Sequence, residues 1–185
     1  MPQNTTVNTV VDGGWLLHKV KWQQGGSYQD VIEQYVRYLR QHFGHHVVVV
    51  FDGYDSGATT KDYEHKRRAV KCAPDVAIDL SRPSYSDQTA FLANDSNKKQ
   101  FVEKVMTHLQ HVGLLVKQAA SDADTLIVHT AIELATGGDT VTVVANDTRH
   151  PHHVAGTTTM HLCVILSCIW RQLSKHQFDG SVLAA

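Results

Sequence analysis

Cysteine is scarce in this sequence, with three among 185 residues, and their number and spacing fit neither paired disulfides nor a zinc site. This usage favours a reducing intracellular compartment, nuclear or cytoplasmic. A strong charge of either sign is also lacking, since the net charge is −1 with histidine counted as neutral. Any contact with DNA or RNA must therefore come from local basic patches rather than from a global positive field.

Long hydrophobic segments are missing as well. No stretch reaches the roughly 18 apolar residues that a membrane helix needs, and the first six residues are polar, without the apolar core of a secretory signal. We therefore expect no membrane partner. The hydrophobic content of 42% is enough for a core, and one main domain is the expectation for 185 residues.

Apolar runs and helical patterns alternate along the chain. The β-branched runs predict strands at residues 7–11, 47–51, 114–116 and 141–145. Apolar residues at helical spacing predict helices at residues 28–43, 98–112 and 122–135, with a loop before the first of them, up to Gly26. Strands connected through helices run parallel, so the predicted fold is a three-layer, Rossmann-like α/β domain. A central, mainly parallel sheet would be flanked by helices.

Aspartates stand where the predicted strands end. Three of them follow apolar runs, and a pair opens the predicted helix at 122–135. The functional crevice of an open α/β sheet lies beyond the carboxyl ends of its strands, so these carboxylates should surround one cavity. Their mutual repulsion should then raise some of their pKa values. Oxygen ligands suit Mg²⁺ or Mn²⁺, and the predicted ligands are Asp12, Asp52, Asp122, Asp124 and Asp147.

Each aspartate alone has a simpler interpretation. Asp is a common turn former and helix N-cap, and a single Asp after a strand is more often a cap than a metal ligand. The presence of several at one predicted sheet edge is what favours a metal site. Asp55, which follows Asp52 in the same turn, is expected to be solvated.

A basic segment follows the second predicted strand. Five cations lie between residues 61 and 71, and most such runs are simply solvated helix faces. Lys61 and Arg68 are seven residues apart, however, and would share one face of a helix that begins at the acidic edge. There they could hold a phosphodiester against the metal site, since Lys and Arg supply the phosphate contacts of nucleic-acid-binding proteins.

Together these motifs resemble the PIN-like nuclease domain of the flap endonuclease and XPG type. That family has an aspartate after its first strand, a V-F-D-G motif, paired acids opening a helix, and a closing D-x-D. Here the matching residues are Asp12, residues 50–53, residues 121–124, and Asp147 with Arg149. The resemblance implies a divalent-metal-dependent nuclease acting on DNA or RNA. It also implies a catalytic role for Lys61 and Arg68, which match the spacing of a lysine and an arginine that assist phosphate activation.

The resemblance stops after Thr148. Arg149 stands where the family has its second D-x-D carboxylate, and a guanidinium there should weaken metal binding. Synonymous codons permit a reading shifted by one nucleotide, in which the segment starting at Arg149 becomes Asp-Ile-Leu-Ile-Met-Leu-Leu. A frame slip and alternative splicing are both open explanations. We predict a PIN-like domain at 1–148, incomplete at its C-terminal end, and a tail at 149–185 outside the family pattern.

Two functions are consistent with these features. The first is a metal-dependent nuclease whose activity is impaired in this chain. The second is a catalytically inactive PIN-like domain that binds nucleic acid or protein partners, which Arg149 favours. A phosphatase on another Mg²⁺-using α/β fold is disfavoured, because the D-x-D motif expected after its first strand is replaced by Asp12 and two glycines.

Overall fold

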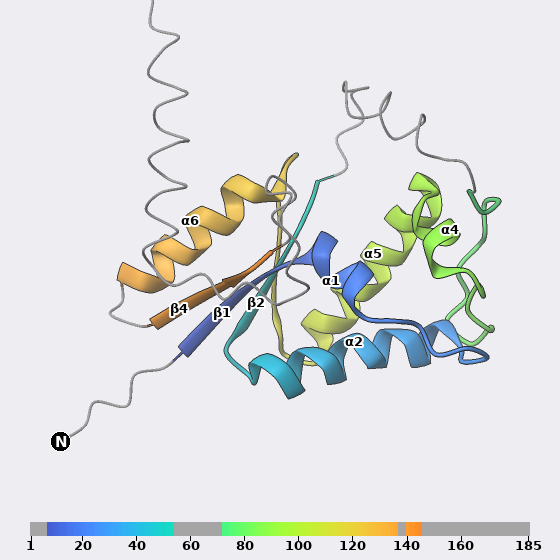
Figure 1. The fold of residues 1–185 in the computed structure, drawn as a ribbon, viewed down its shortest axis with the longest axis horizontal. Coiled ribbons are helices and arrows are strands. Elements are labelled where there is room, and N and C mark those ends of the chain that lie inside the picture. The colour runs from blue at the N-terminus through green and yellow to red at the C-terminus, as the bar shows by residue number, and fades with distance from the viewer. Residues whose placement is uncertain (1–6, 54–71, 137–139, 146–185) are drawn as a thin grey trace, which may run out of the picture.

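The protein is built around a sheet of four parallel strands in the order β3-β2-β1-β4 (Figure 1). A computed structural model describes residues 7–53, 72–136 and 140–145. The strands are β1 (Val7–Asp12), β2 (Val47–Phe51), β3 (Leu115–Gln118) and β4 (Thr140–Val144). The predicted three-layer α/β fold with a parallel central sheet is therefore confirmed.

Helices cover both faces of the sheet (Figure 1). On one face lie α1 (Gly13–Lys19), α2 (Tyr28–Phe43) and α5 (Asp95–His111), with the short α4 (Gln88–Leu92) packed against α5. On the other face, α6 (Ala123–Thr136) contacts β1, β2 and β4. In the described part of the chain, no helix is both long and apolar enough to cross a membrane.

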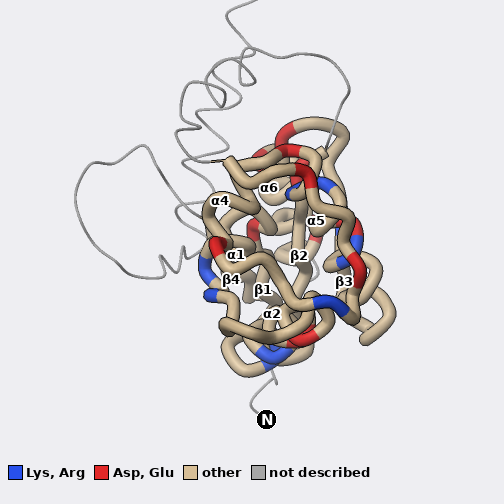
Figure 2. The backbone as a smooth tube through the Cα atoms, turned by 90° about the vertical axis from the view of Figure 1, so that its right-hand side faces the viewer, with Lys and Arg blue, Asp and Glu red and all other residues tan. Residues whose placement is uncertain are grey.

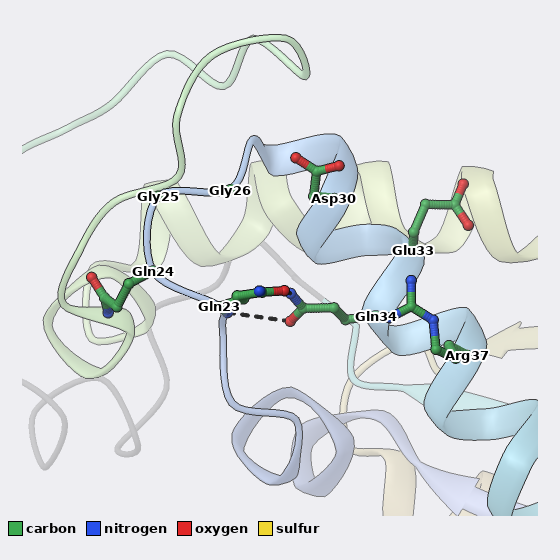
Figure 3. A pocket seen from close by; sticks show the side chains of 8 residues that line it. All are labelled: Gln23, Gln24, Gly25, Gly26, Asp30, Glu33, Gln34 and Arg37. Atoms are coloured by element: carbon green, nitrogen blue, oxygen red, sulfur yellow. Dashed lines mark hydrogen bonds between the residues drawn. The ribbon is translucent and has the colours of Figure 1, made fainter.

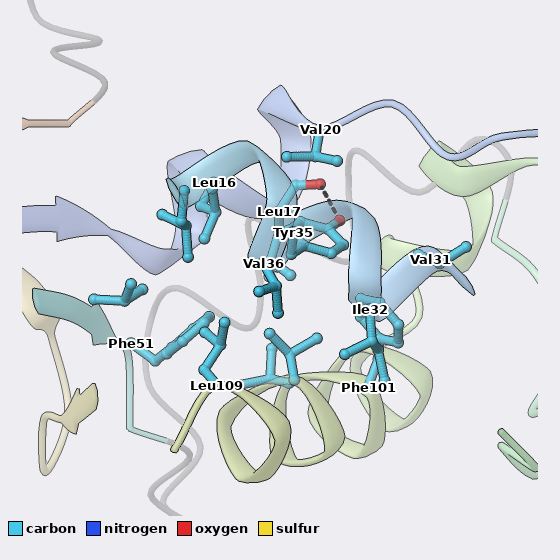
Figure 4. Close-up of a cluster of buried hydrophobic side chains, with 14 of the residues drawn as sticks. Leu16, Leu17, Val20, Val31, Ile32, Tyr35, Val36, Phe51, Phe101 and Leu109 are labelled. Carbon is cyan, nitrogen blue, oxygen red and sulfur yellow. Dashed lines mark hydrogen bonds between the residues drawn. The ribbon is translucent and has the colours of Figure 1, made fainter. Parts of the chain in front are cut away.

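Strand β2 is the centre of the core. All five of its side chains are buried, and they alternate between the two faces. Val47, Val49 and Phe51 belong to the larger cluster under α1, α2 and α5, whereas Val48 and Val50 face α6. Figure 4 shows Phe51 among the side chains of the larger cluster. A strand covered on both faces needs apolar residues at every position, which explains the uninterrupted run V-V-V-V-F.

The predicted loop up to Gly26 is wrong in its first part, because Gly13–Lys19 forms helix α1. Two glycines at its start give it little intrinsic helix propensity. Tertiary contacts compensate: Leu16 and Leu17 are buried, and the Leu17 carbonyl accepts hydrogen bonds from Tyr35 Oη (3.0 Å) and Gln88 Nε2 (2.9 Å). Burial raises the pKa of the Tyr35 hydroxyl, which therefore stays a protonated donor.

The other elements lie close to their predicted bounds. Helix α2 matches residues 28–43, begins with a capping box of Ser27 and Asp30, and ends at Gly44, whose positive φ of 72° suits glycine. Helix α5 starts at Asp95, three residues before the prediction, because the Asn94 side chain caps it. The third strand is β3 at 115–118 rather than 114–116, and α4 was not predicted.

The order in which strands are added to the sheet reverses at β1, because β2 and β3 lie on one side of it and β4 lies on the other. From β1 the chain passes to β2 through helices on one face, whereas it reaches β4 through α6 on the opposite face. β1 and β4 are nevertheless neighbours, with Val11 paired to Val144. Open α/β folds bind their ligands at the carboxyl ends of such strands. Asp12 is the last residue of β1 and lies at this point.

Candidate acidic site

Asp12 joins the sheet to helix α1. It is half-buried, and its Oδ1 accepts a hydrogen bond from the Gly14 backbone N–H at 2.8 Å as the N-cap of α1. The pKa of its carboxyl is raised, first by burial and then by the nearby charges of Asp52 and Asp124, while the N–H groups of Gly14 and Trp15 act in the opposite direction. Burial is thus the larger cause of the raised pKa of Asp12, and the neighbouring carboxylates contribute in the expected direction.

Asp52 connects the end of β2 to the start of α6. Its Oδ1 accepts a hydrogen bond from the backbone N–H of Ala123, the first residue of α6, at 3.0 Å. Its Oδ2 lies on the side of Asp12: a Cβ placed on Gly14 would be 3.8 Å from Asp52 Oδ2 and 3.2 Å from Asp12 Oδ1. The two carboxylates thus approach each other around Gly14, which has no side chain to separate them.

The paired acids at the start of α6 take different positions. Asp122 precedes the helix, and its Oδ1 accepts a hydrogen bond from the Asp124 N–H at 3.1 Å. Asp124 lies in the first turn of α6, near enough to Asp12 to raise its pKa. The positive end of the α6 dipole stabilises carboxylates at this place. Asp12 and Asp52 therefore approach each other, with Asp124 near enough to act electrostatically on Asp12. The predicted capping role applies to Asp12, Asp52 and Asp122.

Two glycines allow the segments around the acidic site to approach each other, a role that no sequence pattern predicted. A Cβ on Gly13 would overlap the buried ring of Phe51, and a Cβ on Gly53 would overlap the carbonyl oxygens of Ala119 and Ala120. Gly53 also donates its backbone N–H to the Ser121 carbonyl at 2.7 Å. The glycines that follow Asp12 and Asp52 in the sequence are therefore needed for the close packing of neighbouring segments, because any side chain there would overlap them.

Asp147, Lys61 and Arg68 lie outside the described residues, as does Asp55. Within residues 7–53, 72–136 and 140–145, no three His, Cys, Asp or Glu side chains form a group that could hold a metal ion. The described carboxylates have the right chemistry for a hard divalent cation, and Asp12 and Asp52 would supply two of the oxygen donors such an ion needs.

Away from the acidic edge, the described part of the molecule has mixed surface charge and a polar hollow. Figure 2 shows acidic and basic residues interspersed over the described chain. A polar hollow of about 410 Å³ lies between the α1–α2 loop and the first half of α2 (Figure 3). Its side chains are engaged locally: Gln23 is hydrogen-bonded to Gln34, and Asp30 to Ser27. None of the predicted metal ligands lines it.

The raised pKa of Asp12 gives a testable pH dependence. A carboxyl whose pKa is higher in the folded state binds more protons there, so its ionisation lowers stability as the pH rises above the unfolded value of about 3.9. Asp12→Asn keeps an N-cap side chain but removes the charge. Without divalent ions, it should raise the free energy of unfolding at pH 7 by about 0.5–2 kcal/mol, as stabilising changes at functional sites commonly do.

Urea denaturation between pH 3.5 and 7.5 measures this effect. The gain in the free energy of unfolding should shrink toward pH 3.5, where Asp12 is mostly protonated in both the folded and the unfolded state. Asp87→Asn at the exposed N-cap of α4 is the matched control and should leave stability nearly unchanged at every pH. A gain that is the same at pH 3.5 and pH 7.5 would show that the charge of Asp12 is not its cause.

Comparison with known proteins adds no assignment. No family model matches the chain, and a search of curated proteins found no match.

Proposed function

We propose that this chain contains a divalent-metal-dependent nuclease domain of the PIN-like, flap endonuclease type, with impaired activity in its present form. The observation that supports this most directly is the approach of Asp12 and Asp52 at the carboxyl edge of a parallel sheet, with Asp124 nearby, beside the point where the strand order reverses. Carboxylates near each other at that position, with one pKa raised by burial and then by its neighbours, are typical of a functional site.

In this proposal Asp12 and Asp52 are the first ligands of Mg²⁺ or Mn²⁺. Each holds one oxygen against a backbone N–H, at Gly14 and Ala123, and this contact orients the carboxylate. Asp122, Asp124 and Asp147 complete the acidic edge. When bound, a divalent ion supplies Lewis-acid stabilisation of the charge that develops during phosphodiester hydrolysis. Lys61 and Arg68 steady the phosphate, and DNA or RNA is the substrate.

The second candidate is a PIN-like domain without catalysis that binds nucleic acid or a protein. Arg149 favours it, because a cation beside Asp147 would oppose a second metal ion. For either function we infer a nuclear or cytoplasmic location from the cysteine usage; Cys72 is an exposed free thiol.

Cleavage assays distinguish the two candidates. The 185-residue chain should cleave a labelled DNA or RNA oligonucleotide poorly, and Arg149→Asp alone should restore little, because the segment after Thr148 still departs from the family pattern. A version continued in the alternative reading frame from codon 149 should recover Mg²⁺-dependent cleavage, on the order of 100-fold faster, the scale of rate lost with one charge-stabilising group.

The controls for this assay use the acidic edge itself. Asp122→Ala in the continued version should abolish the recovered activity, and EDTA should do the same. Robust cleavage by the present chain, lost on Asp122→Ala, would show that Arg149 does not impair the site. No cleavage by the continued version, with binding of the oligonucleotide retained, would favour the inactive domain.

A further inference from the structure

A row of aromatic rings runs along the surface from helix α1 to the end of α2. It consists of Trp15, Tyr38, His42 and Phe43, and we call it the aromatic ridge. The Trp15 and Tyr38 ring centroids are 6.4 Å apart, Tyr38 stacks on His42 at 4.1 Å, and Phe43 lies edge-on to Tyr38 at 6.2 Å. These contacts connect the four rings into one continuous group.

The ridge differs from the aromatic core of the protein in its exposure. The core rings, such as Trp22, Phe91 and Phe101, are buried. In the ridge, Trp15, Tyr38 and Phe43 are half-buried against the larger core cluster, and His42 is exposed. One part of each half-buried ring is therefore held in place by the core while another part stays accessible. Rings held in this way lose little conformational entropy when a ligand packs on them.

The ridge begins at the acidic site. Trp15 lies in the first turn of α1, and its backbone N–H is one of the two groups that lower the pKa of Asp12 by hydrogen bonding. The Trp15 ring is 6.4 Å from that of Tyr38 on α2, so the ridge leads away from the start of α1. A strand with a phosphodiester at Asp12 and Asp52 would therefore have a neighbouring base near Trp15.

Cations accompany the ridge and its helix. Lys19 Nζ lies 5.7 Å from the centre of the Trp15 ring. Burial lowers the pKa of His18 on the same helix, and the nearby charges of Lys98 and Lys21 lower it further. Positive charge is therefore present around α1 despite the near-neutral net charge of the chain. Aromatic rings with adjacent cations are how proteins bind single-stranded nucleic acids.

We propose that the aromatic ridge is a stacking platform for unpaired bases of a DNA or RNA strand that enters the acidic site. This proposal depends on the proposed function for its ligand class and adds a location and a strand form. Trp15 and Tyr38 supply to the bases the parts of their rings that Lys19 and His42 leave uncovered, and Lys19 contacts the phosphate backbone. Base pairs in a duplex would hide the base faces, so single strands should bind better than duplexes.

Binding of a fluorescein-labelled oligothymidylate to the 185-residue protein tests the proposal by anisotropy, with Ca²⁺ in place of Mg²⁺ to suppress cleavage. Trp15→Leu and Tyr38→Leu keep an apolar side chain but remove the stacking surface. Each should weaken binding about 10-fold. Tyr85→Leu replaces a half-buried aromatic outside the ridge and should change binding less than twofold. Lys19→Gln should weaken binding and reduce its salt dependence, whereas Lys104→Gln on α5 should not.

Tryptophan emission gives a second readout that does not depend on variants of the ridge. In a Trp170→Phe background the remaining tryptophans are Trp15 and the buried Trp22. Oligothymidylate should quench the emission of this variant, and a duplex of equal length should quench it less. Trp15 emission that neither acrylamide nor the oligonucleotide quenches would mean that another part of the chain covers the ridge, which would overturn the proposal.

The outcomes separate this proposal from the proposed function. Oligonucleotide binding that survives Trp15→Leu and Tyr38→Leu would overturn the ridge while leaving a nucleic-acid substrate in place. Equal affinity for duplex and single strand would also overturn the ridge alone. Failure of every DNA and RNA oligonucleotide to bind would overturn both the ridge and the proposed substrate class.

Discussion

Asp52→Ala is expected to weaken Mn²⁺ binding about 100-fold, because it removes both a proposed ligand and an orienting contact. Loss of one supporting contact around a metal ligand commonly costs about 10–100-fold in affinity, and here the carboxylate itself is lost as well. Asp52 Oδ1 holds the start of α6 through Ala123 N–H, and α6 carries Asp124 in its first turn. The substitution therefore also loosens the placement of a second carboxylate. Calorimetric titration with Mn²⁺ measures the loss.

Two further variants identify the cause of that loss. Asp55→Ala, in the same turn, should reduce affinity much less, since Asp55 is expected to be solvated. Asp52→Asn removes the charge but keeps an oxygen that can accept a hydrogen bond from Ala123 N–H. It should therefore weaken Mn²⁺ binding nearly as much as Asp52→Ala while keeping the contact that holds the start of α6. Equal losses in Asp52→Ala and Asp55→Ala would refute the ranking of the two residues.

Gly53→Ala is expected to lower the free energy of unfolding by about 3 kcal/mol, at the upper end of the usual cost of overpacking. The added methyl group would overlap the carbonyl oxygens of Ala119 and Ala120. These are backbone atoms and cannot move to another rotamer. The segment after β3 must shift, which breaks the Gly53 N–H bond to Ser121 and moves the start of α6 away from Asp52. Urea denaturation measures the change.

Gly26→Ala is the matched control for Gly53→Ala. A Cβ there would meet Asp30 Cβ at 3.4 Å, an ordinary contact, and Gly26 does not need a positive φ. Its expected effect is within about 1 kcal/mol, as at other sites where a glycine can be replaced without strain. If Gly53→Ala were as mild as Gly26→Ala, the approach of residues 119–120 to Gly53 would not be a constraint on the fold.

Periodicity predicted the elements that are long or strongly patterned. The uninterrupted apolar run of β2 and the amphipathic pattern of α2 matched the structure residue for residue. α1 was missed because its glycine start and short length carry no helical signal, and its stability comes from Leu16, Leu17 and the bonds to the Leu17 carbonyl. β3 was misplaced because it is short and lies at the sheet edge, where Leu115 is 66% exposed and burial imposes little pattern.

The placement of Asp12 and Asp52 at one sheet edge was predictable from the sequence, and their contacts were not. Aspartates after parallel strands must lie at one sheet edge, which is why Asp12 and Asp52 could be placed together in advance. The contacts could not be predicted: Asp52 bonds to Ala123, 71 residues away, because Gly53 allows the segment at Ala119 and Ala120 to approach. Asp147, Lys61 and Arg68 remain predictions from the sequence.

The sequence by itself determined the class of fold, since strand and helix periods are local properties of the chain, and it determined that Asp12 and Asp52 share one edge of the sheet. Tertiary structure alone decided how far those carboxylates are separated and which oxygens are engaged by backbone N–H groups. It also decided that the rings of Trp15 and Tyr38 form one ridge, because they belong to different helices that packing brings together. Such features depend on contacts between distant segments, whose distances are set by packing rather than by any local pattern.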